Sequence, residues 1–444
     1  MHVDAWLPRA AARHPDRPAV NGLTYAALDA AAGAACAGLE AAGVRGGDRV
    51  ALLLAPGEDF AIALHACLRL GAVAVPVDVR LTDAERSART AGCAVVVDAP
   101  LAGAPAARPA APHDLDAPAI VVHTSGTTGA GRPVELTYGN WLWSALGSGV
   151  ALGVHPDDRW LCALPLSHVG GLSILVRSAI YGTSAVVHEG FDAGRVVAEL
   201  MAPDGPTLVS LVATTLARVL DAGLDHPPRL RCALIGGGPV PGALVERARG
   251  AGVPVAQTYG LTEACSQVTT AAPGHDGEDA GRPLFCTRVA IGDRGEILVK
   301  GPTVAPGAAG ADGWLATGDQ GRLDGEGRLT VTGRLADTIV TGGENVAPAE
   351  VEAVLAEHPA VAEAAVHGRP DAEWGEAVVA AVVLRPGARA DADELRRHCA
   401  ARLAGFKVPK EVRFLAALPR NHAGKLQRHL LRDPAIAQSP ACRP

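Results

Sequence analysis

Helix-like and strand-like segments alternate along most of this 444-residue chain, and the alternation limits the folds that it can adopt. The segment "YAALDAAAGAACAGLEAAGV" is typical of a helix that ends at Gly43, and the next segment, "DRVALLL", is typical of a buried strand. "DFAIALHACLRLGA" then predicts a helix, and "VAVPV", "CAVVVDA" and "AIVVHTS" predict strands. Because such alternation packs best on largely parallel sheets, we predict an α/β fold.

The pattern changes at about residue 285. "RVAIGDRGEILVKG" and "GRLDGEGRLTVTGRLADTIVTGG" indicate strands separated by glycine-rich turns. "APAEVEAVLAEHP" then predicts a helix, and the segments after it predict two strands and a further helix. We therefore predict a large N-terminal domain of α/β sheets, residues 1–333, and a small C-terminal α+β domain, residues 334–444.

Charge and cysteine content exclude several classes of protein. A net charge of −7 at pH 7 provides no basic surface for nucleic acid or for an anionic membrane. The most apolar stretch, "FAIALHACLRLGAVAVPV", is interrupted by His65 and Arg69, so we expect no membrane span. The nine cysteines are scattered and include no C-x-x-C pair, which favours reduced thiols and a cytoplasmic location.

A glycine- and threonine-rich segment, "HTSGTTGAGRP", directly follows the predicted strand "AIVV". Glycines let backbone N–H groups approach an anion and hydroxyls add donors, so the segment predicts a phosphate-binding loop. A Walker-type NTPase is excluded because Arg132 stands at the required lysine and Pro133 at the required Mg²⁺ ligand. The other interpretation is a mobile loop. The loop residues that we assign to phosphate binding are Thr124, Ser125, Gly126, Thr127, Thr128, Gly129 and Arg132.

Together with later motifs, this loop resembles that of the adenylate-forming superfamily, which comprises acyl-CoA synthetases, adenylation domains of peptide synthetases, and luciferases. The motifs appear in the family's order: "TSGTTGAGR", "LIGGGPV", "QTYGLTEACSQ", "WLATGDQGRL", "GRLADTIVTGGENVAPAEVE" and "PRNHAGKLQR". The chain departs from the family at Gly131-Arg132-Pro133, where Pro-Lys-Gly is usual, and at Ala336, where the hinge is often Asp or Lys.

The resemblance implies ATP, Mg²⁺ and coenzyme A as ligands and gives each motif a role. Tyr259, followed by Gly260, would stack on adenine, and Thr262 would meet the α-phosphate. Glu263 would hold Mg²⁺, for which a hard oxygen ligand is suited. Asp319 would accept hydrogen bonds from the ribose, and Arg334 would contact the ribose and phosphate region. The glycine segment along the adenine would be Gly236, Gly237 and Gly238, which alone would equally fit a strand-to-helix turn.

The remaining residue that we assign to catalysis is a lysine near the end of the chain. Only four lysines occur among 40 basic residues, and Lys425 lies behind a glycine in a polar segment. A compact ammonium on a flexible stem can reach a small oxygen cluster, whereas an arginine fork is broader. The resemblance implies that a mobile C-terminal domain carries Lys425 to the adenylation site. The alternative is a solvated lysine on a terminal loop.

The implied reaction joins an acid to AMP and then to a thiol. The segment "LPLSHVGGLSIL" has no acidic residue to pair an α-amino group, so an amino acid is disfavoured as the substrate. Within the family the chain most resembles the o-succinylbenzoate–CoA ligases of menaquinone synthesis. We keep as alternatives another aryl or medium-chain acid, a carrier protein as acceptor, and a nucleotide-binding protein without catalysis. A homodimer is one assembly that fits.

The acid pocket is the least defined part of this interpretation. His168 would line the pocket, although a structural histidine is the other interpretation. Arg177 would be either the ligand of a second substrate carboxylate or a surface arginine. The residues that we assign to the pocket are His168, Thr214, Ser266 and Gln267.

Overall fold

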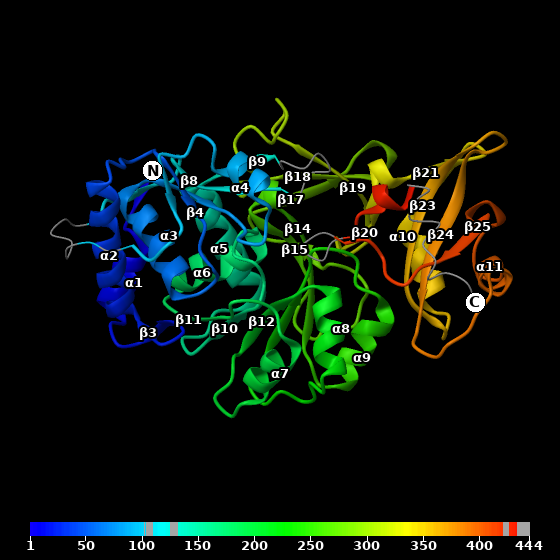
Figure 1. Cartoon of the computed structure of the whole chain (residues 1–444), viewed down its shortest axis with the longest axis horizontal. Helices are drawn as coiled ribbons and strands as arrows, with labels where there is room; N and C mark the ends of the chain where they lie inside the picture. The colour runs from blue at the N-terminus through cyan, green and yellow to red at the C-terminus, as the bar shows by residue number, and fades with distance from the viewer. Residues whose placement is uncertain (102, 104–109, 125–131, 421–425, 433–444) are drawn as a thin grey trace.

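The computed structural model describes residues 1–101, 103, 110–124, 132–420 and 426–432 (Figure 1). Within these ranges the strands form four larger sheets and one two-stranded pair, in which β1 (His2–Val3) meets β7 (His113–Asp114). The prediction of an α/β fold with a large N-terminal and a smaller C-terminal part is confirmed. Figure 1 shows the C-terminal elements, coloured yellow to red, gathered at one end of an elongated molecule.

The first sheet has five strands in the order β6-β4-β5-β8-β9, parallel except for the final antiparallel pair. Two of its helices, α2 and α3, lie within about two residues of the predicted segments, whereas α4 was not predicted. Gly71, at φ +75°, ends the second of them in the left-handed region that glycine tolerates. The strands are β4 (Arg49–Leu52), β5 (Val73–Pro76), β6 (Val95–Val97), β8 (Pro118–His123) and β9 (Pro133–Thr137). The helices are α2 (Tyr25–Ala41), α3 (Glu58–Leu70) and α4 (Asp83–Thr90).

The second sheet has nine strands in the order β16-β15-β14-β13-β12-β10-β11-β2-β3. The strands from β14 to β2 are parallel, and the pairs at both ends are antiparallel. The strands are β2 (Pro18–Val20), β3 (Leu23–Thr24), β10 (Arg159–Cys162), β11 (Ser184–Val187), β12 (Leu208–Leu211), β13 (Cys232–Ile235), β14 (Val255–Leu261), β15 (Ser266–Thr270) and β16 (Arg282–Pro283). The accompanying helices are α1 (Trp6–Arg13), α5 (Tyr138–Leu152), α6 (Val169–Tyr181), α7 (Ala193–Met201), α8 (Ala213–Asp221) and α9 (Gly242–Gly250).

Two further sheets follow the change of pattern seen in the sequence. The antiparallel third sheet contains β17 (Arg288–Ile291), β18 (Glu296–Lys300), β19 (Leu315–Leu323) and β20 (Leu329–Arg334). The fourth contains β21 (Ile339–Thr341), β22 (Glu344–Val346), β23 (Val361–Asp371), β24 (Gly375–Leu384) and β25 (Glu411–Phe414), with α10 (Pro348–Ala356) and α11 (Ala392–Ala400). Short 3₁₀ helices are η1 (Thr262–Ala264), η2 (Asp293–Gly295), η3 (Leu335–Asp337), η4 (Gly405–Lys407) and η5 (Arg428–Arg432).

The cores of the two parts are separate, and each contains a fully buried cysteine. Cys67 lies in the large core with α2 and α3, and Cys399 lies in the core of the fourth sheet. Burial raises the pKa of the Cys67 thiol to about 12 and that of the Cys399 thiol to about 11. Within the described part of the chain, none of the helices has the length and apolar character that crossing a membrane requires.

Candidate nucleotide- and acid-binding site

Three residues predicted to contact the nucleotide meet at the junction of the second and third sheets. The Tyr259 hydroxyl donates to Oδ2 of Asp319 at 2.9 Å, and the Arg334 Nε lies 2.9 Å from Oδ1 of the same carboxylate. Asp319 is buried, whereas about half of the Arg334 side chain is exposed. Burial, and then the charge of Asp319, raise the pKa of Tyr259 far above its usual value, so the phenol stays a neutral donor.

Strand pairing explains why these residues meet. Asp319 on β19 stands directly opposite Arg334 on β20, so a single hairpin places the carboxylate beside the guanidinium. Tyr259 on β14 precedes an irregularity in the pairing with β15, where Gly260 faces Gln267. A Cβ at Gly260 would overlap the carbonyl oxygen of Ser266, so this close approach requires glycine.

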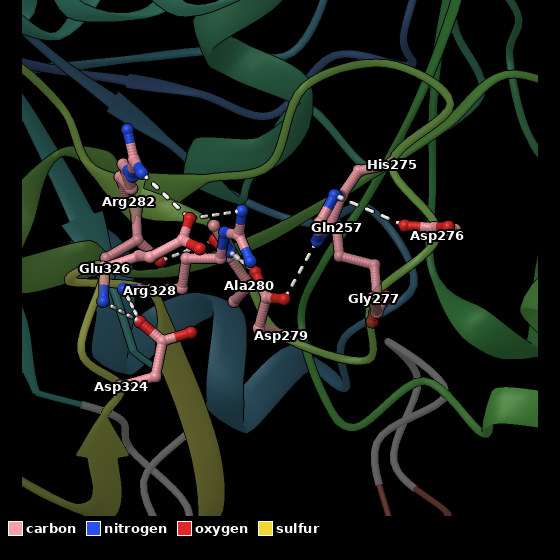
Figure 2. A network of polar contacts seen from close by, with 12 residues as sticks. Gln257, His275, Asp276, Gly277, Asp279, Ala280, Arg282, Asp324, Glu326 and Arg328 are labelled. Carbon is pink, nitrogen blue, oxygen red and sulfur yellow. Dashed lines mark hydrogen bonds and ion pairs between the residues drawn. The ribbon is translucent and has the colours of Figure 1, made fainter.

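A polar network joins β14 to the loop between β15 and β16 (Figure 2). The Gln257 side chain on β14 donates from Nε2 to the carbonyl oxygen of Gly277 at 2.9 Å. In the same loop His275 Nε2 lies 2.8 Å from Asp279 Oδ2, and Asp279 Oδ1 accepts the N–H of Gly281. These bonds tie the loop between β15 and β16 to the strand that carries Tyr259.

The predicted adenine segment, Gly236–Gly238, follows the end of β13. A Cβ at Gly236 would lie 2.9 Å from the methyl group of Thr258, so a larger residue there would press on the strand beside Tyr259. Gly237 has φ +82°, and its surroundings include Val212, just before α8. Thr214, assigned to the acid pocket, is half-buried in the first turn of α8. The glycine segment therefore lies between the adenine tyrosine's strand and the start of α8.

Thr262 and Glu263 lie in η1, immediately after the strand that carries Tyr259. Both are half-buried, and within the described residues no hydrogen bond or ion pair holds the Glu263 carboxylate. In the described residues no group of three or more His, Cys, Asp or Glu side chains is arranged around a common metal position. A single carboxylate is the donor set that suits Mg²⁺ bound mainly through substrate phosphates and water. Glu263 therefore fits the metal that the resemblance implies.

The ends of the predicted phosphate loop lie at adjoining strand ends. Thr124 follows β8, and its N–H donates to the carbonyl oxygen of Arg132 at 2.9 Å just before β9. The Arg132 side chain is exposed. The remaining residues assigned to phosphate, Ser125, Gly126, Thr127, Thr128 and Gly129, lie outside the described residues, as does Lys425.

His168 lies in a polar cluster that the sequence did not predict. It precedes α6 and interacts electrostatically with Asp78, whose Oδ2 also lies 3.4 Å from the Ser167 hydroxyl. Burial opposes ionisation of Asp78, but hydrogen bonds from the Arg80 side chain and backbone N–H outweigh it and hold the pKa at about 2. The sequence feature that could have indicated this cluster is the position of Asp78, a polar residue after the buried strand β5.

The other acid-pocket residues lie around the β14–β15 hairpin. Ser266 pairs with Leu261, and Gln267 is buried with an Oε1 that has no hydrogen-bond partner among the described residues. The interpretation of Arg177 as a surface residue is wrong, because only 2% of it is exposed. Arg177 donates from Nη2 to the Ser144 hydroxyl, which donates in turn to the Cys265 carbonyl oxygen beside Ser266.

The predicted hinge at Ala336 lies next in sequence to Asp337, which contacts Arg428 near the end of the chain. Ala336 is exposed in η3, so rotation there would disturb little side-chain packing. Arg428, three residues after Lys425, contacts Glu352 through two oxygens at 2.7 and 2.6 Å and Asp337 at 3.3 Å. The chain directly after the predicted catalytic lysine is thus held against η3 and α10.

Comparisons with known proteins agree with this geometry. A family model described as "AMP-binding enzyme" matches residues 7–102 and 92–308, and "AMP-binding enzyme C-terminal domain" matches residues 350–425. A 2-succinylbenzoate–CoA ligase of Bacillus licheniformis is 40% identical, over 96% of this chain and 98% of that protein.

Solved structures are similar over nearly the whole chain. The o-succinylbenzoate CoA synthetase of Bacillus subtilis in complex with its acyl-adenylate intermediate matches with a TM-score of 0.91, 38% identity, and coverage of 99% of this chain and 100% of that one. The same Bacillus subtilis enzyme in complex with ATP and magnesium ion matches with a TM-score of 0.90 at 38% identity, over 98% of this chain and 100% of that one.

Proposed function

The chain belongs to the family of AMP-binding enzymes, and on this basis we propose that it is an AMP-forming ligase that joins o-succinylbenzoate to coenzyme A. The contacts among Tyr259, Asp319 and Arg334 support the part of the proposal that concerns nucleotide binding. Near full-length similarity to 2-succinylbenzoate–CoA ligases supports the choice of acid. The reaction places the enzyme in menaquinone biosynthesis.

In the first half-reaction a substrate carboxylate oxygen attacks the α-phosphorus of ATP, and the bond to the β-phosphate breaks to release pyrophosphate. Asp319 would accept the ribose hydroxyls, and Tyr259 would stack on adenine while its hydroxyl stays on Asp319. Thr262 would donate to the α-phosphate. Glu263 would hold Mg²⁺, which neutralises charge on the polyphosphate. Lys425 would lie between carboxylate and phosphate and stabilise the charge of the transition state.

In the second half-reaction the thiol of coenzyme A, as thiolate, attacks the acyl carbonyl carbon, and AMP leaves. We propose that the domains, residues 1–333 and 334–444, rotate about Ala336 between the two steps. Exposure of Ala336 supports this assignment, because backbone rotation there requires no repacking. The rotation would take Lys425 away and bring the turn at Gly342 and Gly343 toward the active site.

We assign the acid to a pocket that includes His168, Thr214, Ser266 and Gln267. The buried, unpartnered Gln267 Oε1 supports a polar contact in this region. His168 interacts electrostatically with the Asp78 carboxylate, which supports a polar character for this part of the pocket. We also expect a cytoplasmic location and a homodimer, which would fit a biosynthetic ligase.

The test is release of pyrophosphate and formation of a CoA thioester with a panel of acids. o-Succinylbenzoate should exceed benzoate and octanoate in both assays. Equal or faster turnover of octanoate would exclude the specific acid and leave the AMP-forming class intact. Transfer to a carrier protein, with no thioester formed on coenzyme A, would exclude coenzyme A as acceptor.

A further inference from the structure

A separate cavity of about 170 Å³ lies between α4 and the first sheet. Three nitrogen-bearing side chains line it, Arg49 from β4, Arg89 from α4 and His123 from the end of β8, together with apolar residues that include Val75, Val121 and Cys93. None of these residues has a role in the adenylation site proposed above. The cavity is too small for a drug-sized ligand, which usually needs at least about 300 Å³.

Two polar atoms in the cavity lining lack a partner within the described residues. They are Nδ1 of His123, whose residue is only 9% exposed, and Nε of Arg89, and both atoms are buried. Such groups are unusual in native proteins and are normally satisfied by a bound molecule or by water. The cavity could hold about five waters at roughly 30 Å³ each. Its volume therefore suits a small ion with its hydration.

The charged side chains around the cavity indicate whether the bound ion would be an anion or a cation. Arg49 is partly neutralised, because its Nη2 lies 3.2 Å from Glu135 Oε2. Glu85 and Asp78 act electrostatically on Arg89, and Asp78 is itself engaged by Arg80. Burial chiefly, and then the charges of Arg89 and Arg49, lower the pKa of His123 to about 4, so the imidazole is neutral near pH 7 and the two guanidiniums are the charged groups of the cavity lining. The two guanidiniums would repel a metal ion, whereas an oxyanion would accept from Arg89 Nε and from His123 Nδ1 in the tautomer that carries its proton there.

We propose that this cavity binds a small phosphate-type oxyanion, either orthophosphate or pyrophosphate. Arginine is the side chain best suited to phosphate oxygens, because its planar fork can donate two parallel hydrogen bonds. His123 and Pro133, which both line the cavity and pair across β8 and β9, stand in the sequence on either side of the segment predicted to bind phosphate. For pyrophosphate as the source, the inference rests on the proposed function, which releases that ion.

Calorimetric titration of the full chain with orthophosphate and with pyrophosphate tests the proposal. The titrations are run with saturating AMP, so that the nucleotide site is filled, and without Mg²⁺. Arg89→Gln should weaken binding at least about tenfold, the loss expected for one charge-assisted hydrogen bond. Arg89→Lys, which keeps the charge, should recover part of the affinity. Arg86→Gln is the matched control, because Arg86 lies on the same helix, pairs with Asp83 and does not line the cavity.

Tighter binding of pyrophosphate than of orthophosphate supports the reaction product as ligand, and equal or weaker binding supports free phosphate. The proposal is overturned if the parent binds neither ion, so that the cavity holds only water, or if Arg89→Gln and Arg86→Gln bind alike. Circular dichroism checks that each variant is folded. CoA-thioester formation, measured on the same preparations, tests the proposed function independently, because anion binding is assayed without acid or ATP.

Discussion

Replacing Asp319 with asparagine is the sharpest test of the nucleotide site. Each carboxylate oxygen already has one neighbour, the Tyr259 hydroxyl at 2.9 Å and the Arg334 Nε at 2.9 Å, and each has a further lone pair for a ribose hydroxyl. The variant keeps the shape of the side chain but removes its charge and one acceptor oxygen. Affinity for AMP should therefore fall while the fold is retained.

The magnitude follows from the hydrogen bonds. Bonds to a charged group contribute about 1.5–3 kcal/mol and neutral ones about 0.5–1.5 kcal/mol, so weakening two should cost roughly 2–3 kcal/mol. At 1.4 kcal/mol per tenfold, AMP should bind roughly 30- to 140-fold more weakly. The ion pair with half-exposed Arg334 adds little, because solvent screens it.

Calorimetric titration with AMP measures this loss, and denaturant unfolding checks the fold. Asp324→Asn is the control, because Asp324 is a carboxylate in the turn of the same hairpin and accepts only backbone N–H groups there. An Asp319→Asn protein that binds AMP within about threefold of the parent would refute the assignment of this carboxylate to the ribose.

Four further outcomes are expected. Glu263→Gln should lose Mg²⁺-dependent turnover at unchanged circular dichroism, and turnover near that of the parent at several Mg²⁺ concentrations would remove Glu263 as the metal ligand. Lys425→Ala should slow adenylation roughly 10²-fold or more while thioester formation from supplied acyl-adenylate changes little; equal loss in both half-reactions would contradict the role. Gly260→Ala should unfold at lower denaturant concentration, because its Cβ would overlap a backbone carbonyl oxygen of β15, and an unchanged midpoint would show that the hairpin adapts. Burial lowers the pKa of His113 from 6.5 to about 4, so the unfolded chain binds the proton first; His113 should therefore contribute roughly 3 kcal/mol to the fall in the free energy of unfolding from above pH 6.5 to below pH 4, and His113→Asn should reduce the fall by about that amount.

Much of the fold could be predicted because its signals are local. The left-handed glycine after α3 and the alternation of helix and strand in the first sheet depend on residues adjacent in sequence. The predicted strand "DRVALLL" and the structure's Arg49–Leu52 differ only at their ends. The pairing of Gly260 with Gln267 is different, because it depends on an irregular register that no periodicity reveals.

The least predictable features of the site are contacts between distant segments. Arg177 was given a surface position as one alternative, yet its Nη2 reaches Ser144 on another helix and its guanidinium lies over the Trp160 ring. Asp78 was not singled out because no motif contains it, and its importance comes from packing against residues 167 and 168. Tyr259, Asp319 and Arg334 were found through the resemblance, whereas their mutual hydrogen bonds are visible only in three dimensions.

The buried cysteines allow the opening of each core to be measured from the rate at which its thiol reacts. Cys67 and Cys399 are fully buried, one in each of the separate cores, and both thiols have raised pKa values. Because only an exposed thiolate reacts, alkylation of each cysteine reports how often its own core opens. Modification rates at the two positions, read by mass spectrometry, would therefore show whether the N-terminal and C-terminal parts unfold together or one at a time.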